Sequence, residues 1–399
     1  MSNSKTIRRL NKHILVDGFH VIVDTEKSHG SYIVDAETGK EYLDCYSQFA
    51  SQPLGWNHSS LLKAQSHLGR VALHKLANSD MYSVDYADFV ESFSDITPDF
   101  CHYFFIDGGA LGVENALKAS FDWKAQKLGI HSQEAVNNMD VVHFGKAFHG
   151  RTGYTMSLTN TDPVKTKRFP QFSWTTINNL EYLRQYMNSN VAAIIVEPIQ
   201  GEGGDNHFKV DLFHELRSLA DLYESILIFD EVQTGVGLTG KMWAYEHFGV
   251  VPDMMCFGKK TQVCGFCSTD RIDEEKFNVF TTSGRINSTW GGNIVDMVRF
   301  SYIMEAIRKE HLVDNAQDVG SRLLWNLRSI DHIDNTRGRG LMLAFDLESP
   351  QQRDKVFTKL QDKMLVLKCG LKSIRLRPAL TFSEEDADLA SDYIQEAVR

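Results

Sequence analysis

The sequence predicts an α/β fold built on a mostly parallel sheet. From about residue 60 to 295, short apolar runs that favour β-structure alternate with helical segments, which is typical of a parallel sheet covered by helices. VAAIIVEP at 191–198 and ILIFDE at 226–231 flank the helical segment VDLFHELRSLADLYE, and this predicts one complete β–α–β unit. Ligands of open α/β sheets lie beyond the carboxyl ends of the strands, so Asp230 is a candidate site residue.

Composition narrows the class of protein. The chain has 399 residues, of which 42% are hydrophobic and 24% charged, so it can form two or three domains with sizeable cores. Its net charge of -10 and the lack of a concentrated Lys/Arg stripe argue against nucleic acid or an anionic membrane as a partner. No run reaches the ~20 apolar residues of a membrane helix. We expect a cytoplasmic protein with six reduced cysteines.

The patterning predicts that the two chain ends form one small domain beside a large one. Residues 1–58 are strand-rich, with turn signals at HGS and ETGK that favour a hairpin or meander. Residues 59–295 form the predicted large domain. Residues 296–399 begin with long helices and end with strands and a helix, which we assign to the C-terminal part of the small domain. Residues 176–190 are expected to form a polar helix and a turn.

A strand–glycine–helix unit lies at 102–127. The run HYFFI is followed by Gly108, Gly109 and Ala110 and then by a helical pattern. Small residues at a helix start let backbone N–H groups approach an anion, and the helix dipole favours the negative charge there. The turn therefore suits a phosphate, although many such turns bind nothing.

A carboxylate and an amine follow two apolar strands of the predicted sheet. Asp230 ends ILIFD, and Lys259 and Lys260 end DMMCFGKK. Pyridoxal phosphate needs both groups, because a lysine amine holds its aldehyde as a Schiff base and a carboxylate keeps its ring nitrogen protonated. The alternative is that these residues are only helix caps or solvated strand ends.

Four motifs in order strengthen the hypothesis of a cofactor site. They are EPIQGEGGD at 197–205, IFDEVQTG at 228–235, FGKKTQVCG at 257–265 and INSTWGGN at 286–293. Together they resemble the class III aminotransferases, most closely those that act on the ε-amino group of lysine. The resemblance implies a fold type I enzyme with pyridoxal 5'-phosphate, a seven-stranded, mostly parallel sheet in the large domain, and a small α+β domain. It also implies a homodimer with shared active sites.

The resemblance assigns a set of residues to the cofactor. Lys259 is the catalytic residue, which binds the aldehyde and then carries a proton as general acid and base. Lys260 is expected to be structural, because successive strand residues face opposite ways. The residues assigned to the cofactor are Lys259, Asp230 at the ring nitrogen, Gln233 at the ring hydroxyl, Val232 and Phe148 on the two ring faces, Gly109 and Ala110 at the phosphate, and Thr289 from the neighbouring subunit.

A second set is assigned to the substrate. Arg151, in FHGR at 148–151, presents a planar fork that matches a carboxylate. Phe49 is assigned to the pocket wall, with a buried turn aromatic as the alternative. Glu202 and Arg375 are expected to form an ion pair that closes for lysine and opens for glutamate, with a fixed structural pair as the alternative. The neighbouring His149 is expected to be an ordinary hydrogen-bonded histidine.

The reaction implied by the resemblance is an amino-group transfer. L-Lysine and 2-oxoglutarate would give 2-aminoadipate 6-semialdehyde and L-glutamate. Two departures from the expected pattern, Ala379 in RPAL and the loop YSQFASQPLGWN at 46–57, keep 4-aminobutyrate or another ω-amino acid open as the donor. The other alternative, a non-catalytic relative that binds the cofactor, is opposed by the presence of Lys259 and Asp230.

Two further motifs are assigned to structure. Cys264 and Cys267 form a C-x-x-C without a second such pair, so core packing is favoured over a metal or redox site. Residues 235–240 satisfy G-x-G-x-x-G, but DEVQT separates them from the strand, so we expect turns and no dinucleotide site. The sequence thus predicts no metal centre.

Overall fold

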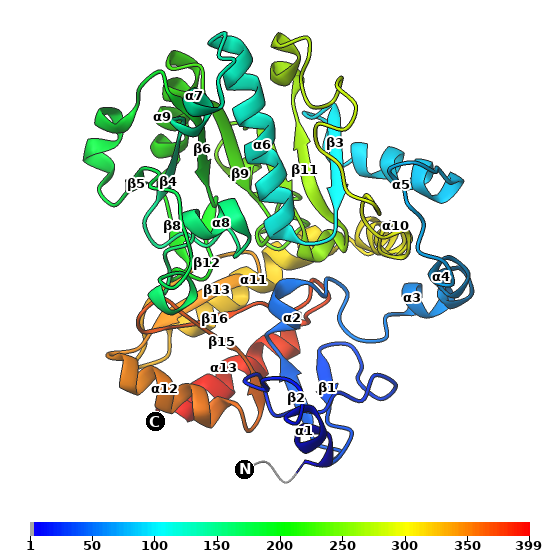
Figure 1. The fold of residues 1–399 in the computed structure, drawn as a ribbon. Coiled ribbons are helices and arrows are strands. Elements are labelled where there is room, and N and C mark those ends of the chain that lie inside the picture. Colours follow the sequence, from blue (N-terminus) through cyan, green and yellow to red (C-terminus); the bar gives the residue numbers. More distant parts are fainter. Residues whose placement is uncertain (1–3) are drawn as a thin grey trace.

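A seven-stranded sheet forms the centre of the larger part of the molecule (Figure 1). The structure, a computed structural model, describes residues 4–399. Among the described strands of this sheet, β11 is the one that runs antiparallel to its neighbours. In spatial order the strands are β3 (His102–Ile106), β11 (Cys264–Ser268), β10 (Met254–Phe257), β9 (Ile226–Asp230), β6 (Val191–Val196), β4 (Asp140–Phe144) and β5 (Thr176–Ile177). The predicted mostly parallel, seven-stranded sheet is confirmed.

The side chains of β9 alternate between two apolar cores. Ile226 and Ile228 pack on the face covered by α6 (Gly109–Lys127), whereas Leu227 and Phe229 pack on the opposite face. That second face is covered by α5 (Val84–Ser94), α9 (Val210–Leu222) and α10 (Ile294–Lys309). Because both faces are buried, the strand is apolar throughout rather than alternating with polar residues. Asp230 ends it as its first polar residue.

The predicted β–α–β unit is confirmed, with one addition. Strands β6 and β9 are parallel neighbours, and α9 connects them on one face of the sheet. Before α9 the chain forms a small antiparallel hairpin of β7 (Ile199–Gln200) and β8 (Asn206–His207). The hairpin holds the EPIQGEGGD segment above the carboxyl end of β6, where its carboxylates reach the site described below.

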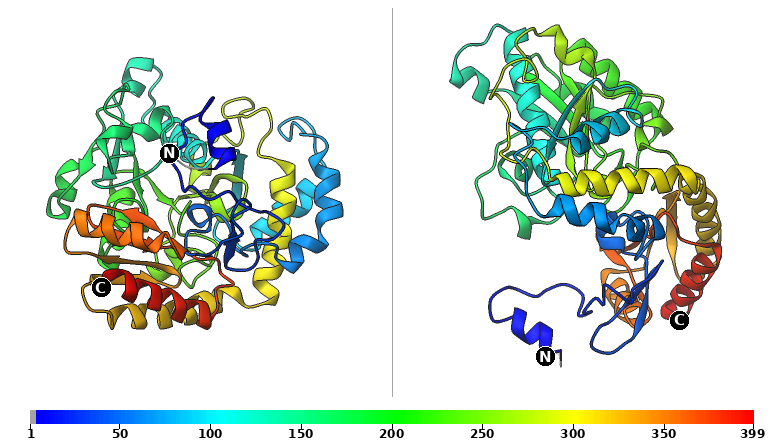
Figure 2. Two further views of the ribbon diagram at one scale, coloured as in Figure 1. Left: turned by 90° about the horizontal axis from the view of Figure 1, so that it is seen from below. Right: turned by 90° about the vertical axis from the view of Figure 1, so that its right-hand side faces the viewer.

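The two chain ends lie together in the smaller part of the molecule (Figure 2). Strand β14 (Met364–Leu365) pairs in parallel with β2 (Glu41–Asp44), which is joined to β1 (Tyr32–Val34) as the predicted hairpin. The other elements there are β12 (Asp334–Arg339), β13 (Met342–Asp346), β16 (Ser373–Leu376) and β15 (Leu367–Cys369) in one antiparallel sheet, with α11 (Leu312–Arg328), α12 (Pro350–Leu360) and α13 (Glu384–Val398). The domain boundaries at 58 and 295 stay predictions, and α10, which begins at Ile294, contains the second one.

Residues 176–190 differ from the expected polar helix and turn. Thr176 and Ile177 form β5 at the edge of the sheet, paired with β4, and a 3-10 helix η2 (Leu180–Tyr186) follows. An edge strand needs only one paired side, so it can be short and polar. The Asn179 side chain accepts from the N–H of Glu181 and starts the 3-10 helix, because Asn readily caps such turns.

Short elements complete the chain. Within residues 4–399, no helix has the length and apolar character needed to cross a membrane. Gly237 and Gly240 have positive φ angles in successive turns, so the G-x-G-x-x-G run forms turns as predicted. The short elements are α1 (Lys5–Leu10), α2 (Ser47–Ala50), α3 (Ser59–Lys63), α4 (Gln65–Ala72), α7 (Gln133–Asn137), α8 (Gly153–Leu158), η1 (Pro163–Lys165), η3 (Ala244–His247), η4 (Lys259–Thr261) and η5 (Asp270–Glu274).

Candidate active site

A cavity of about 540 Å³ lies at the carboxyl ends of the central strands. Its walls come from segments far apart in the chain, including the turn α2, the start of α6, the loops after β4, β6, β9 and β10, and strand β16. The predicted site residues that line it are Phe49, Gly109, Ala110, Phe148, Arg151, Glu202, Asp230, Val232, Gln233, Lys259 and Arg375. One predicted residue, Thr289, is exposed and does not line it.

The start of α6 lines this cavity with Gly109 and Ala110. Gly108 has φ of 108°, and among the described residues no side chain caps this helix. A Cβ on Gly109 would lie 2.9 Å from a methyl group of Val232, so a larger residue here would displace Val232 from the cavity wall. The free N–H groups of a 19-residue helix favour a phosphate at this position.

Asp230 is held by a histidine that lies behind it. His149 Nδ1 is 2.7 Å from Asp230 Oδ2, and the Val232 N–H donates to Asp230 Oδ1 over 3.1 Å. Burial lowers the pKa of His149, but the hydrogen bond and charge of Asp230 outweigh it and leave that pKa raised. His149 therefore holds its proton more tightly than a free imidazole does. His149 is hydrogen-bonded as expected, and because its partner is Asp230 it positions the residue assigned to the cofactor ring.

Glu197 fixes two loops near Asp230, one that carries Phe148 and one that carries Gly201. Its carboxylate accepts the N–H of Phe148 over 2.9 Å and that of Gly201 over 3.0 Å. Burial raises the pKa of Glu197 to about 7, although the charge of His149 opposes the shift. Glu197 fixes the backbone that carries the Phe148 ring on the cavity wall.

Two arginines fix the orientation of the Gln233 side-chain amide. Its Oε1 accepts from Arg377 Nε over 3.0 Å and from Arg375 Nη1 over 3.4 Å. Guanidinium groups only donate, so the oxygen must face them and the NH₂ group is directed away from them. Arg377 is fully buried and is ion-paired with the fully buried Asp205. The amide can therefore present a donor to an oxygen in the cavity.

The two adjacent lysines have different environments. Lys259 lines the cavity, and burial, opposed by Asp230 and reinforced by Arg375, lowers its pKa to about 8. The amine of Lys260 is buried and donates to the carbonyl oxygens of Gln233, over 2.7 Å, and Ala50, over 3.2 Å. Lys260 is structural as predicted, but for a different reason: the pair lies in the turn η4 beyond β10.

Phe49 reaches the cavity from a left-handed turn. The four residues of α2, Ser47–Ala50, all have positive φ angles, between 39° and 64°. Non-glycine residues adopt this region at a cost of about 1–2 kcal/mol each. Asp44 accepts the N–H of Ser47 over 2.7 Å, and the Lys260 bond to Ala50 holds the other end. Phe49 is 52% exposed at the cavity rim, so it is not the buried turn aromatic considered as the alternative.

Glu202 does not pair with Arg375 in this structure. Its Oε1 is ion-paired with Lys165 of η1, and Thr161 Oγ1 donates to it over 3.0 Å. Arg375 is 4% exposed, and within the described chain its Nε has no hydrogen-bond partner. The expected Glu202–Arg375 pair is thus absent here, and Lys165 holds the carboxylate instead.

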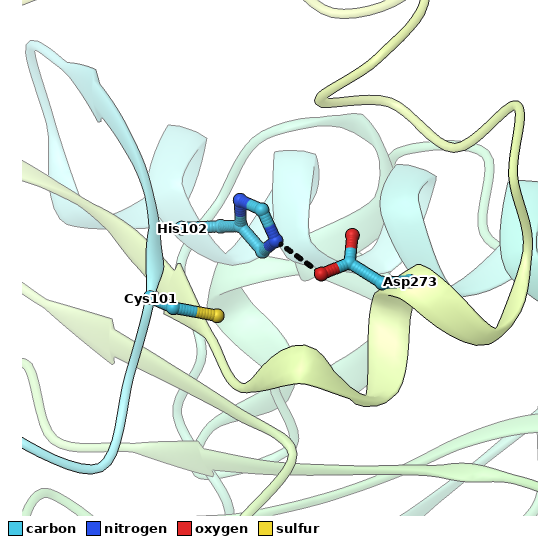
Figure 3. Close-up of side chains that lie close together, drawn as sticks. All are labelled: Cys101, His102 and Asp273. Carbon is cyan, nitrogen blue, oxygen red and sulfur yellow. Dashed lines mark hydrogen bonds and ion pairs between the residues drawn. The ribbon is translucent and has the colours of Figure 1, made fainter.

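A separate surface cluster has the residue types of a metal site (Figure 3). Cys101, His102 and Asp273 lie close together away from the cavity, and Cys101 and Asp273 are exposed. His102 Nε2 is 2.8 Å from Asp273 Oδ2, and Asn278 donates to Asp273 Oδ1 over 3.2 Å. Both carboxylate oxygens therefore already have protein partners. Cys264 and Cys267 are both buried in β11. Cys267 packs in the apolar core as predicted, whereas Cys264 lines the cavity.

Pyridoxal phosphate fits the groups that surround the cavity. The uncapped start of α6 suits its phosphate, and Asp230 suits its ring nitrogen. The Gln233 amide donor suits its ring oxygen, and the Lys259 amine suits its aldehyde. Phe148 and Val232 both line the cavity and can cover the flat faces of the ring. The sequence alone missed His149, Glu197, Lys165 and Arg377, which hold these groups in place.

Comparison with known proteins defines the class. A family model described as Aminotransferase class-III matches residues 16–398. The chain belongs to the class III aminotransferases, which use pyridoxal phosphate.

The aminotransferases described next match this chain over nearly its whole length. The L-lysine-epsilon aminotransferase of Amycolatopsis lactamdurans is 44% identical over 95% of this chain and 92% of its own. The mitochondrial 4-aminobutyrate aminotransferase of Mus musculus is 32% identical over 97% of this chain and 87% of its own. A solved structure of the lysine aminotransferase of M. tuberculosis, in the internal aldimine form, superposes with a TM-score of 0.91 at 42% identity, covering 98% of this chain and 97% of that one.

Proposed function

We propose that the enzyme transfers the ε-amino group of L-lysine to 2-oxoglutarate, giving 2-aminoadipate 6-semialdehyde and L-glutamate. The observation that carries the proposal is a pair of arginines at different depths of one cavity. Arg151 is exposed and Arg375 is buried, and within residues 4–399 neither has a carboxylate in an ion pair. A dicarboxylate such as 2-oxoglutarate can use both, whereas lysine, with one carboxylate, needs only Arg151.

The chain's residues then have distinct tasks. Bound pyridoxal phosphate supplies the electron sink that lets a proton leave the substrate carbon. Lys259, with its pKa lowered to about 8, can take and return that proton near neutral pH. Arg151 orients the substrate by its distant carboxylate, and Phe49 covers the rim of the cavity and limits water there.

Lysine is favoured over 4-aminobutyrate as the donor by the similarity to the lysine enzymes reported above. Both donors present a terminal amine at a distance from a single carboxylate, so the catalytic groups do not separate them. The choice depends on the distance from Lys259 to Arg151 and on the rim residues Phe49 and Gln48, which both line the cavity.

Half-reactions test the proposal. The holoenzyme is mixed with lysine, ornithine or 4-aminobutyrate in the absence of an acceptor, and the absorbance of the bound cofactor is followed. Lysine should give the largest rate constant divided by KM, and the product should have the mass of the 6-semialdehyde. A larger value for 4-aminobutyrate would establish the alternative donor.

We also propose that the active form is a homodimer in which Thr289 completes the partner's phosphate site. Ser79 Oγ donates to the carbonyl oxygen of Thr289 over 3.1 Å, so the loop that carries Thr289 lies against the segment around Ser79. That segment carries Leu73, Met81, Tyr82 and Val84, each at least 67% exposed. Such a concentration of exposed apolar side chains suits a second copy of the chain.

Sedimentation and dilution test the dimer. Thr289→Ala should weaken cofactor retention about tenfold through loss of a charge-assisted hydrogen bond. Thr282→Ala, in the same segment but bonded to the carbonyl oxygen of Phe277, is the control. A fully active monomer would contradict the proposal.

A cytoplasmic location also belongs to the proposal, supported by six free cysteines in the described chain.

A further inference from the structure

Lys165 lies at the substrate end of the cavity in a position that no motif indicated. It ends η1, and its amine is ion-paired with Glu202 and 3.3 Å from Thr161 Oγ1. The same amine lies 5.4 Å from the centre of the Phe148 ring. The side chains of Lys165 and Glu202 are only 20% and 25% exposed, so their attraction is less screened than that of a surface pair.

Arg375 has no carboxylate partner in the described chain while Lys165 holds Glu202. Glu202 and Arg375 line the same cavity. With Glu202 bound by Lys165, the contact of Arg375 with Gln233 Oε1 at 3.4 Å is its one side-chain hydrogen bond among residues 4–399. A buried guanidinium in this condition has a strong preference for a carboxylate. Glu202 is therefore a carboxylate of the same cavity for which Arg375 can compete with Lys165.

We propose that Lys165 is a specificity-determining positioning residue, which holds Glu202 off Arg375 and keeps Arg375 open for the carboxylate next to the reacting carbon of a dicarboxylate substrate. When a substrate without that carboxylate binds, Glu202 leaves Lys165 and neutralises Arg375. Lys165 acts through Glu202 and does not contact the substrate. The inference deepens the proposed function and rests on it for the identity of the two substrates.

The proposal has a direct competitor. Lys165 is cationic and lies beside Phe148 and Arg151, so it could instead bind a substrate carboxylate itself. The two roles predict opposite results when Glu202 is removed together with Lys165. In the proposed role, loss of Glu202 frees Arg375 and makes Lys165 dispensable. In the competing role, loss of Lys165 weakens binding with or without Glu202.

Calorimetric titration of the holoenzyme with two unreactive acids separates these roles. Glutarate carries both carboxylates of 2-oxoglutarate, and hexanoate carries one carboxylate on the carbon chain of lysine. Lys165→Met should raise the glutarate Kd about tenfold, because Glu202 then blocks Arg375, and should change the hexanoate Kd less than twofold. The double variant Lys165→Met/Glu202→Gln should bind glutarate within about threefold of the unmodified enzyme.

Controls keep the result interpretable. Lys167→Met removes an exposed positive charge two residues away and should leave both dissociation constants unchanged. Lys165→Arg should retain most of the glutarate affinity. In the glutamate half-reaction, Lys165→Met should raise KM with little change in kcat. Thermal unfolding checks that the variants remain folded.

Three outcomes would overturn the proposal. Weak glutarate binding by the double variant would make Lys165 a direct carboxylate ligand. Equal weakening of glutarate and hexanoate would indicate a general effect of charge, and an unchanged glutarate Kd in Lys165→Met would leave the ion pair without a role. The titrations use no lysine turnover. If lysine proves not to be a substrate while the glutarate pattern holds, only the proposed function fails.

Discussion

The two ends of the cavity are built in different ways. At the cofactor end, Asp230 and Gln233 each have a partner behind them: His149 for Asp230, and Arg377 for Gln233. Asp205 in turn pairs with Arg377. At the substrate end, Arg151 and Arg375 have no ion-pair partner in the described chain. Glu202 is held there by a partly exposed lysine rather than by a buried group.

The difference follows from what each end must bind. The cofactor is the same in every turnover, so the residues that bind it need only one geometry, which rigid hydrogen bonds can maintain. The substrates alternate, so their end needs charges that can change partners. If this contrast is correct, substitutions at the cofactor end should damage chemistry, stability or cofactor retention, whereas substitutions at the substrate end should shift the preference between substrates.

The largest loss is expected from Lys259→Ala. Removal of the amine abolishes covalent attachment of the cofactor and the proton transfer, and general acid–base catalysis alone contributes about 10²–10⁴-fold. We expect kcat to fall by at least about 10³-fold, measured with saturating donor and acceptor. Borohydride reduction followed by peptide mapping should place the label on Lys259 in the unmodified enzyme.

The adjacent lysine provides the matched control. Lys260→Met keeps the length of a side chain whose amine bonds two carbonyl oxygens. It should lower stability while retaining a measurable covalent attachment at Lys259. A label on Lys260 would contradict the assignment of the two residues.

Arg377→Met tests the rigid frame at the cofactor end. The substitution leaves the Asp205 carboxylate fully buried and without its cation, and breaking a buried pair in this way costs about 3–5 kcal/mol. The free energy of unfolding from denaturant titrations should fall by that amount. Arg377→Met/Asp205→Asn, which removes both charges, should regain much of the loss. Equal instability of the single and double variants would show that packing rather than charge is responsible.

The sequence predicts most of the fold because the fold depends on local pattern. Short, continuous apolar runs such as ILIF and VAAIIV predict strands of a sheet that is buried on both faces. The helical segment between two such strands then predicts the β–α–β connection. The edge strand β5 was missed because its two residues, Thr176 and Ile177, are too few to show a period. The register and the packing of β14 on β2 depend on contacts between distant segments, which no local pattern encodes.

The site divides in the same way. Residues that face the cofactor lie at strand ends within motifs, so their position marked them. The residues that support them could not be recognised from their position in the sequence. His149 and Asp230 are 81 residues apart, and Arg377 and Gln233 are 144 apart. His149 lies inside the FHGR motif, but its task depends on what stands behind it in space. Lys165 lies in a polar segment without a motif, and its pairing with Glu202 is visible only in three dimensions.

His149→Phe tests whether support from behind matters at the cofactor end. Asp230 loses the hydrogen bond over 2.7 Å from the imidazole behind it. Hydrogen bonds to charged groups contribute about 1.5–3 kcal/mol, so cofactor retention should weaken about 10–100-fold. His149→Gln, which keeps an N–H donor, should weaken it less. Cofactor release on dialysis, followed by absorbance, provides the measurement, and unchanged release in His149→Phe would contradict the role.

The smallest effect concerns pH and tests the electrostatic link between Asp230 and Lys259. With its pKa lowered to about 8, roughly a tenth of the Lys259 amine is neutral and nucleophilic at pH 7, far more than for an ordinary lysine. The rate at which the apoprotein captures pyridoxal phosphate should therefore rise about tenfold per pH unit below pH 8 and level off above it.

The negative charge of Asp230 raises this pKa against the effect of burial, so Asp230→Asn should move the midpoint to lower pH. Stopped-flow absorbance with Lys260→Met as the reference, whose midpoint should remain near that of the unmodified protein, checks the shift. A midpoint above pH 10 in the unmodified protein would show that the amine is solvated rather than buried, and the cofactor end would then be less rigid than the comparison requires.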